Sequence, residues 1–337
     1  MFECRRALLE IGIALATVLV LLGEPVDAQS WRPPADGQRC PSKWGAGDQR
    51  GSGNHMKPES VLRATRLIRT GEVIELGHVL SADMPISSTR RFDMHVKRTF
   101  MNPQSNRRGS NEEIVLSEIG QVGTQFNGFA HQTIENSLYN CFKLDEIATR
   151  TGFTKLGVDN VGALITRGVL LDVAALKGVD MLADNYEITV ADLQQALQRQ
   201  NLALQPGDAV IIHTGWGKLW AKDNTRYMKG CPGIGVAAAE WLARQDPMLV
   251  GSDNFPVEVS PNPDPQISAP VHQIMLVING IPPAREPQAG RARGQASARV
   301  RVRDAAAEAE GSDRRLDRRA DRDPLSAPCD LWCFRLE

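Results

Sequence analysis

The stretch “PGDAVIIHTGW” (residues 206–216) decides the fold class of this sequence. Its Pro-Gly pair predicts a turn, and the apolar run that follows is typical of a buried strand. The stretches “ALITRGVLLDV” (residues 163–173) and “PMLVGSD” (residues 247–253) have the same character. We therefore expect all three to be strands of one buried sheet.

Two stretches with helical spacing lie between these strands. “TVADLQQALQRQN” (residues 189–201) is amphipathic, and Thr189 and Asp192 are placed like a capping box at its start. “GVAAAEWLARQ” (residues 235–245) also favours a helix. Short apolar strands that alternate with helices predict an α/β domain with a mixed sheet.

The region before these elements is more polar. Residues 29–60 are rich in Gly and Pro and predict an irregular segment. “PESVLRATRLIRTG” (residues 58–71) has helical spacing and a Gly stop, whereas “EVIELGHVL” (residues 72–80) favours a strand. The Arg-rich stretch at residues 87–111 predicts a long loop.

The N-terminus has the three parts of a secretory signal peptide. Arg5 and Arg6 form a basic region, residues 11–23 form an apolar run, and “VDA” (residues 26–28) is a small-residue cleavage signal. The apolar run is short for a membrane span, although an uncleaved anchor is the alternative. We expect residues 1–28 to be removed and the mature chain to be periplasmic or secreted, without membrane association.

Composition limits the class of partner. The chain has 337 residues, a formal net charge of -1 and 42% hydrophobic residues, enough for one large domain or two ordinary ones. The balanced charge gives no reason to expect nucleic acid as a partner. Of six cysteines, Cys4 lies in the signal peptide, and the odd remainder does not form a disulfide framework. An oxidising compartment permits one disulfide, which the sequence does not pair.

The stretch “QVGTQFNGFAH” (residues 121–131) has the pattern of a catalytic loop. It resembles the signature His-x-Gly-Thr-His-x-Asp-x-Pro-x-His of the metal-dependent cyclase family, which includes bacterial kynurenine formamidase and isatin hydrolase. The stretches at residues 166–174, 206–216 and 270–281 are similar to the same family in the same order. The nearest pattern is a subgroup with GTQFDG in place of GTHxDAP. The resemblance covers residues 40–281 and implies a mixed-sheet, swivelling β/α/β-type cyclase fold, similar to kynurenine formamidase.

The resemblance also implies a site. Gln121, Gln125 and Asn127 occupy the positions of the His, His and Asp ligands of the first metal, and His272 that of a second-site ligand. Positions 125 and 127 of an extended segment point to the same side, so both side chains can face one ion. Neutral amides are weaker ligands than imidazole and carboxylate. We therefore expect a divalent metal, Zn or Mn, that is bound weakly or not at all.

His131 occupies the position of the catalytic histidine that transfers a proton. In this family a metal-bound water attacks a carbonyl, and a histidine that titrates near neutrality returns a proton to the leaving amine. The resemblance implies an arylformamidase-like hydrolase of an amide, formamide or cyclic amide in a small aromatic substrate, in the breakdown of tryptophan to kynurenine. It also implies a homodimer. The alternative is a catalytically inactive relative, either a small-molecule binding protein or a non-functional product.

Several other residues have two interpretations. Phe126, Phe129 and Trp216 are candidates for an aromatic-substrate pocket or for the core. Asp253 and Glu258 either line the cleft or cap loops. His213, at the end of a buried strand, is expected to be structural.

The character of the sequence changes after residue 281. Residues 282–337 are rich in Arg and Ala, contain no Lys and have almost no apolar periodicity. If residues 282 onward are translated back into suitable codons and the frame is shifted by one base, the new frame permits an ordered run of residues similar to the family C-terminus. This run includes the “ENL” segment with the last metal glutamate. We therefore interpret residues 61–281 as the cyclase-like domain and residues 282–337 as an aberrant, disordered tail produced by a frameshift. Glu286 falls near the place of the lost glutamate.

Overall fold

The computed structural model describes residues 30–102, 104–118, 121–292 and 332–334. The chain divides into residues 1–30 and residues 31–337, and all elements described below belong to the second unit. The predicted signal peptide lies outside the described residues. Within the described ranges, every helix is too short or too polar to cross a membrane.

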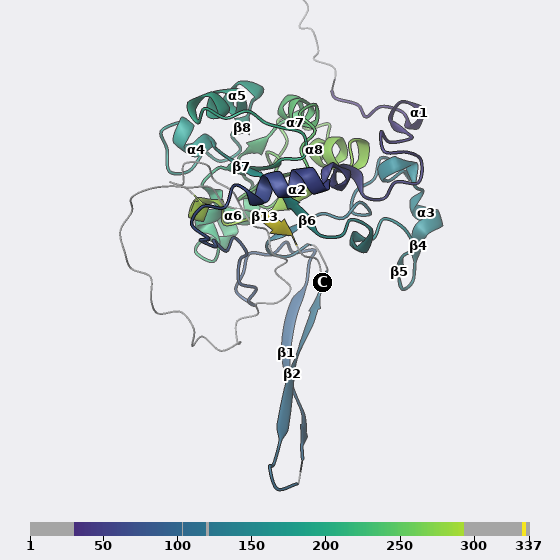
Figure 1. The fold of residues 1–337 in the computed structure, drawn as a ribbon, viewed down its shortest axis with the longest axis vertical. Helices are drawn as coiled ribbons and strands as arrows, with labels where there is room; N and C mark the ends of the chain where they lie inside the picture. Colours follow the sequence, from purple (N-terminus) through teal and green to yellow (C-terminus); the bar gives the residue numbers. More distant parts are fainter. Residues whose placement is uncertain (1–29, 103, 119–120, 293–331, 335–337) are drawn as a thin grey trace, which may run out of the picture. The chain divides into compact units, whose positions relative to one another are not determined.

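A five-stranded sheet forms the centre of the fold, in the order β3-β12-β11-β9-β7 (Figure 1). Neighbouring strands from β12 to β7 are parallel, and β3 is antiparallel to β12. The expected α/β fold with a mixed sheet is thus confirmed. The strands are β3 (Gln125–Phe126), β7 (Gly168–Asp172), β9 (Ala209–His213), β11 (Leu249–Ser252) and β12 (Pro283–Arg285).

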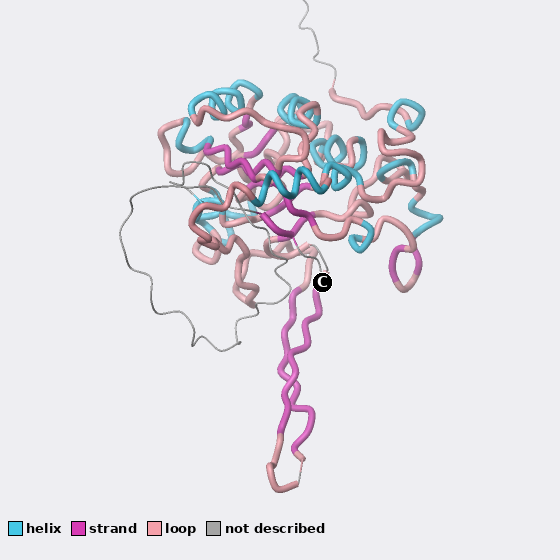
Figure 2. The backbone as a smooth tube through the Cα atoms, viewed as in Figure 1, coloured by secondary structure: helices cyan, strands magenta, loops and turns pink. Residues whose placement is uncertain are grey.

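Both faces of this sheet are buried, because successive side chains of a strand point to opposite faces. Val210 and Ile212 of β9 pack in one hydrophobic cluster, and Ile211 between them packs in another. The first cluster includes residues from α5 (Val190–Arg199), α7 (Val236–Ala243), α8 (Pro270–His272) and the π-helical turn η5 (Gln273–Ile278). The second is completed by residues 126–161, which are largely loops (Figure 2). The continuous apolar runs in the sequence follow from this double burial.

Short elements surround the sheet. The helices are α1 (Asp36–Arg39), α2 (Pro58–Thr65), α3 (Leu144–Ile147), α4 (Val173–Leu176) and α6 (Asn224–Lys229), with helical turns η1 (Gly51–His55), η2 (Tyr139–Cys141), η3 (Val158–Asn160), η4 (Trp216–Leu219) and η6 (Ala289–Ala292). Three strand pairs are β8 (Glu187–Ile188) with β10 (Gly233–Ile234), β4 (Ala148–Thr149) with β5 (Gly152–Phe153), and β6 (Leu164–Thr166) with β13 (Trp332–Phe334).

The predicted capping box is present at the start of α5. The Thr189 hydroxyl accepts from the backbone N–H of Asp192 at 3.2 Å, and the Asp192 carboxylate accepts from the backbone N–H of Thr189 at 3.0 Å. Two donors that a helix N-terminus leaves without partners are therefore satisfied. The helix expected at residues 58–71 is also present as α2, but it ends at Thr65.

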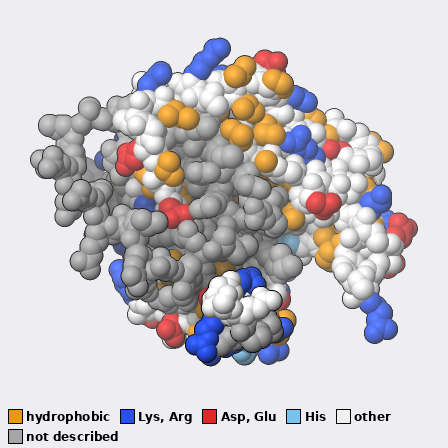
Figure 3. Space-filling view, turned by 60° about the horizontal axis from the view of Figure 1, so that its bottom comes forward, with side chains coloured by type: hydrophobic (Ala, Val, Ile, Leu, Met, Phe, Trp, Pro, Cys, Tyr) orange, Lys and Arg blue, Asp and Glu red, His pale blue; other side chains and the backbone are white. Residues whose placement is uncertain are grey.

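Two expectations for the N-terminal half are wrong. Residues 72–80 form isolated bridges rather than a strand. The long loop expected at residues 87–111 is instead largely a hairpin of β1 (Phe92–Met101) and β2 (Gly109–Ser117), paired antiparallel and standing away from the sheet (Figure 1). Most of its described side chains are exposed, and Phe92, Met94 and Val96 alternate with polar residues in a strand pattern that the many charged residues of the stretch outweighed. Lys and Arg side chains surround its end in Figure 3.

A disulfide joins the irregular N-terminal segment to the loops that cover the sheet. Cys40 and Cys141 are bonded across a sequence separation of 101, with a Cα–Cα distance of 6.0 Å. Nearby, Asp36 accepts from the Lys143 ammonium at 2.6 Å and from the Ser137 hydroxyl at 2.8 Å. The N-terminal segment before α2 thus contains the short helix α1 and the turn η1, and covalent and charged contacts fix it to the domain.

The core extends beyond residue 281. Pro283–Arg285 form β12 between β3 and β11, and Ala289 is buried in the cluster on one sheet face. Trp332–Phe334 pair with β6. The boundary expected after residue 281 is therefore too early by at least eleven residues on the described chain, up to residue 292. Most of the proposed frameshifted tail, residues 293–331 and 335–337, lies outside the described residues.

Candidate active site

Functional side chains gather at one edge of the sheet. The parallel strands β7, β9 and β12 end at Asp172, His213 and Arg285, and Asp253 and Glu286 directly follow β11 and β12. Ligands of open α/β sheets bind beyond the carboxyl ends of parallel strands. The topology thus places two groups of charged side chains at the edge where a site is expected: Asp172, His213 and Asp253 form one, and Arg285 and Glu286 form the other.

A cavity of about 360 Å³ lies at the β12 end of this edge. Its lining includes Gln121, His131 and His272, three of the residues predicted from the sequence, together with Arg285 and Glu286. Residues 85–90 and the loop after β11 complete its wall. Its size is within the range of small-molecule sites.

His272 is held by a buried carboxylate. Its Nδ1 contacts Glu258 Oε1, and Glu258 Oε2 accepts from the backbone N–H of Val271 at 3.1 Å. Both side chains are buried. Because Nδ1 is occupied by the carboxylate, the tautomer that donates to it leaves Nε2 as an acceptor. The π-helical turn η5 begins directly after His272.

His131 lies beside this pair. Its ring centroid is 5.8 Å from that of His272, and its Nδ1 is 3.2 Å from Gln121 Nε2. Burial, which is the largest cause, and the nearby charges of His272, Arg285 and Arg90 together lower the pKa of His131 to about 3. His131 is therefore neutral at physiological pH. When Gln121 donates to Nδ1, the hydrogen of the neutral ring is on Nε2.

Arg285 brings a guanidinium to the cavity wall. It donates to Gln121 Oε1 at 2.9 Å and to the carbonyl of Phe255. Gln121 thus connects Arg285 to His131 through its two amide atoms. Burial lowers the pKa of Arg285.

Glu286 follows Arg285 in a left-handed conformation, with φ of 58°. Its backbone N–H donates to the carbonyls of Ser252 at 3.0 Å and Asn254 at 3.2 Å, and its carbonyl accepts from the Thr124 hydroxyl at 2.7 Å. These bonds fix a conformation that is uncommon for a non-glycine residue. Burial raises the pKa of the Glu286 carboxyl to about 8, although Arg285 opposes this shift.

The other two predicted metal ligands do not line the cavity. Gln125 pairs with Arg285 across the β3–β12 ladder, and the backbone N–H of Asn127 donates to the carbonyl of Pro283 at 2.9 Å. Both side chains are buried, and Gln125 Oε1 and both polar atoms of the Asn127 amide have no hydrogen-bond partner among the described residues. Their assignment as ligands of one ion stays a prediction.

The residues present do not fit a zinc or manganese centre. Among the described residues, no group of three His, Cys, Asp or Glu side chains is placed to hold a metal ion. The cavity instead contains a guanidinium, and the carboxylate of Glu258 is engaged by His272. A divalent cation next to Arg285 would be repelled, and neutral amides offer it little compensation.

The three aromatic residues expected in a substrate pocket are in the core. Phe126 and Phe129 pack in a hydrophobic cluster on one sheet face, and Phe129 stacks on Tyr139 with centroids 4.7 Å apart. Trp216 is fully buried in a third cluster and donates to the carbonyl of Tyr227 at 3.2 Å. The aromatic side chain that lines the cavity is Phe255, which the sequence did not single out.

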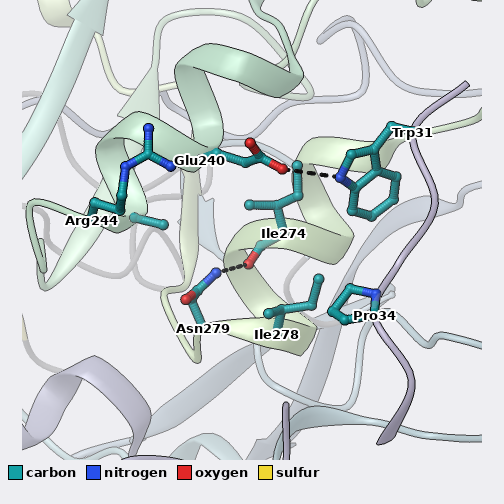
Figure 4. A pocket seen from close by; sticks show the side chains of 8 residues that line it. Trp31, Pro34, Glu240, Arg244, Ile274, Ile278 and Asn279 are labelled. Carbon is teal, nitrogen blue, oxygen red and sulfur yellow. Dashed lines mark hydrogen bonds between the residues drawn. The ribbon is translucent and has the colours of Figure 1, made fainter. Parts of the chain in front are cut away.

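A second cavity, of about 320 Å³, lies between α7, η5 and the N-terminal segment (Figure 4). Trp31 covers one side and donates to Glu240 at 3.2 Å, while Ile274 and Ile278 form an apolar wall. It contains no histidine or cysteine. Of these two cavities, the first is the one lined by histidines.

The comparisons with known proteins agree with this fold. A novel cyclase of known structure is 30% identical, with a TM-score of 0.65, and the match covers 73% of this chain and 85% of that chain. Isatin hydrolase A from Ralstonia solanacearum is 19% identical, with a TM-score of 0.45 and coverage of 64% and 79%. A predicted metal-dependent hydrolase from Bacillus stearothermophilus is 17% identical, with a TM-score of 0.41 and coverage of 64% and 82%. A comparison with curated proteins gives no match.

The family itself is shown by a sequence model. The model of the Cyclase family, described as “Putative cyclase”, matches residues 74–259, which include the loop at residues 121–131 and strands β7, β9 and β11. This match spans more than half of the chain. The protein belongs to the Cyclase family.

Proposed function

We propose that the protein is a hydrolase that cleaves a carbon–nitrogen bond in a small amide, formamide or cyclic amide. The observation that carries this proposal is the buried His272–Glu258 pair beside a neutral His131 in one cavity. A histidine oriented by a carboxylate is the arrangement that takes a proton from a nucleophile and returns it to a leaving group.

The residues of the cavity provide the steps of such a reaction. His272 Nε2 accepts a proton from water as the water oxygen bonds to the carbonyl carbon. The guanidinium of Arg285, fixed by Gln121, stabilises the oxyanion that forms. The carbon–nitrogen bond then breaks, and the proton on His272 passes to the leaving amine. His131, with its low pKa, is a weak base, and its Nε2–H positions the substrate as a hydrogen-bond donor.

The finer assignment rests on the motif resemblance. We propose an arylformamidase-like activity on an aromatic substrate, in the conversion of tryptophan to kynurenine. Phe255 and Met228 in the cavity lining support an aromatic or apolar substrate body. The Cys40–Cys141 disulfide supports an oxidising location, consistent with export of the mature chain to the periplasm or outside the cell. A homodimer remains our proposal from the family resemblance.

The test is hydrolysis of formanilide and related aryl formamides by the purified full chain, with and without a chelator. His272→Ala should lower kcat by at least about 100-fold, because the general base is removed. The matched control is His95→Ala, an exposed histidine of β1, which should leave the rate unchanged. A wild-type rate no faster than the buffer, or an unchanged rate in His272→Ala, contradicts the proposal.

The second candidate function is small-molecule binding without catalysis. The buried Asn127 amide and Gln125 Oε1, which have no hydrogen-bond partner among the described residues, favour it, since both side chains occupy motif positions of metal ligands and hold no charge. Asn127→Asp separates the two: it restores a carboxylate at that position. If neither the wild type nor this variant, supplied with Zn²⁺ or Mn²⁺, hydrolyses a formamide while both still bind an aromatic ligand, binding alone is the function.

A further inference from the structure

We propose that the cavity recognises a carboxylate group on a small aromatic or apolar ligand, with Arg285 as the residue that binds the anion. This proposal rests on the proposed function because it concerns the same cavity. It goes further by specifying that the ligand carries a negative charge. The chain would then use a fixed guanidinium at a site where the family resemblance implied a metal ion.

The first argument is the lack of an internal counter-ion. Arg285 donates to two neutral oxygens, Gln121 Oε1 and the carbonyl of Phe255. A guanidinium has five N–H donors, so these bonds leave others free. Among the described residues, no carboxylate lies within the 4.0 Å of an ion pair with Arg285. The guanidinium is partly buried, and a charge withdrawn from water without an ion-pair partner is costly, so an anionic ligand would supply the missing partner.

The second argument is the position of Arg90. It lies in the loop at residues 85–90 that lines the same cavity. Its charge acts on both His131 and Arg285, which places all three in one electrostatic environment. Two arginines at one small cavity repel each other, and a carboxylate between them removes this repulsion.

The acidic groups nearby do not cancel these charges. Glu258 is engaged by His272 and the backbone of Val271. Glu286 lines the cavity, but its burial favours the neutral carboxyl at neutral pH. The cavity therefore has an excess of positive charge in a low-dielectric surrounding, where charge-assisted hydrogen bonds are strong.

The rest of the lining indicates the body of the ligand. Ile86, Val122, Met228 and Phe255 contribute apolar surface, and Pro256 lies beside Phe255. A cavity of about 360 Å³ with an apolar wall and a charged end fits a single-ring aromatic acid better than a free inorganic anion.

The experiment compares two probes that differ only in charge, 4-aminobenzoate and 4-aminobenzamide, by calorimetric titration of the full chain at low salt. The acid should bind the wild type at least about tenfold more tightly than the amide, because a charge-assisted bidentate contact replaces a neutral one. Arg285→Gln should reduce this preference to about twofold or less. Arg285→Lys, which keeps the charge and loses the planar fork, should keep part of it.

Arg226→Gln is the matched control, since Arg226 is exposed and paired with Asp184 away from the cavity lining, and it should keep the full preference. Arg90→Gln should reduce the preference by a smaller factor and keeps the test valid if Arg285→Gln does not fold. Equal affinity for acid and amide in the wild type overturns the proposal. So does a preference that survives both arginine variants, or no binding of either probe up to about 10 mM.

Hydrolysis separates this proposal from the proposed function. If 4-formamidobenzoate and formanilide are hydrolysed with equal kcat/KM, the hydrolase assignment holds and the anion site is wrong. If 4-aminobenzoate binds through Arg285 but no formamide is hydrolysed, the anion site holds and the hydrolase assignment is wrong.

Discussion

Two histidine sites lie at the same edge of the sheet, and they differ in how completely their polar atoms are satisfied. His213 is held between two carboxylates: Nδ1 is 2.9 Å from Asp172 Oδ1, and Nε2 is 3.7 Å from Asp253 Oδ2. Asp253 also accepts from the backbone N–H of Gly215 and from both donors of Thr214. Every member has several partners.

In the cavity, by contrast, several polar groups lack partners of opposite charge or any hydrogen-bond partner. Arg285 donates hydrogen bonds to neutral oxygens, and Glu286 is a buried carboxyl with a raised pKa. In the neighbouring strand segment, the Asn127 amide has no partner among the described residues. Buried polar groups without partners reduce stability, and they are tolerated mainly where a site requires them. The difference favours a structural role for His213, which stays a prediction from the sequence, and it makes the cavity the better candidate for a ligand site.

Removing Asp253, the central hydrogen-bond acceptor of the His213 site, should have the largest effect on the free energy of unfolding. Asp253→Ala leaves three buried donors without an acceptor and removes a charge next to His213. We expect the free energy of unfolding to fall by about 3–5 kcal/mol, measured by urea denaturation. Asp180→Ala is the control, because that side chain is exposed, and it should change stability by less than about 0.5 kcal/mol. A loss below about 1 kcal/mol in Asp253→Ala would remove the contrast between the two sites.

The sequence predicted the central strands and the helix α5 well, because the signals for these elements are local. The apolar runs of β7, β9 and β11 and the capping box of α5 depend on neighbouring residues alone. The hairpin of β1 and β2 was missed because its charged residues suggested a loop, although Phe92, Met94 and Val96 alternate with polar residues as in a strand.

The site was predicted in part. The motif resemblance singled out Gln121, His131 and His272, and all three line one cavity, while the roles assigned to them stay predictions. Arg285 was missed, and Glu286 was noted only for its place near a lost glutamate, because their segment lacks apolar periodicity and was assigned to an aberrant tail. Their place at the sheet edge depends on the pairing of β12 between β3 and β11, which is long-range information.

A titration tests the cavity side of the comparison. The pKa of Glu286 is about 8 in the folded chain, above its ordinary value of 4.5. Its neutral form is stabilised by folding, so this contribution is fully present below pH 4.5 and is lost as the pH rises through 8. Glu286→Gln should therefore gain stability relative to the wild type between pH 5 and pH 8.5, by roughly 2–4 kcal/mol.

Urea denaturation at both pH values measures this difference between the two proteins. Glu113→Gln, on the exposed hairpin, is the matched control and should show no such gain. Parallel stability curves for wild type and Glu286→Gln across this range would show that Glu286 titrates normally and that the cavity is more polar than its contacts indicate.

The smallest expected effect is also the most direct test of an unsatisfied group. Asn127 is fully buried, and neither polar atom of its amide has a partner among the described residues. Asn127→Leu replaces the amide by an apolar side chain of similar size, so we expect the free energy of unfolding to rise by about 1–2 kcal/mol. Asn111→Leu, at an exposed position of β2, should change it by less than about 0.5 kcal/mol. If Asn127→Leu is destabilising by more than about 1 kcal/mol, the amide has partners that only a bound water or ligand can supply, and Asn127 belongs to the site after all.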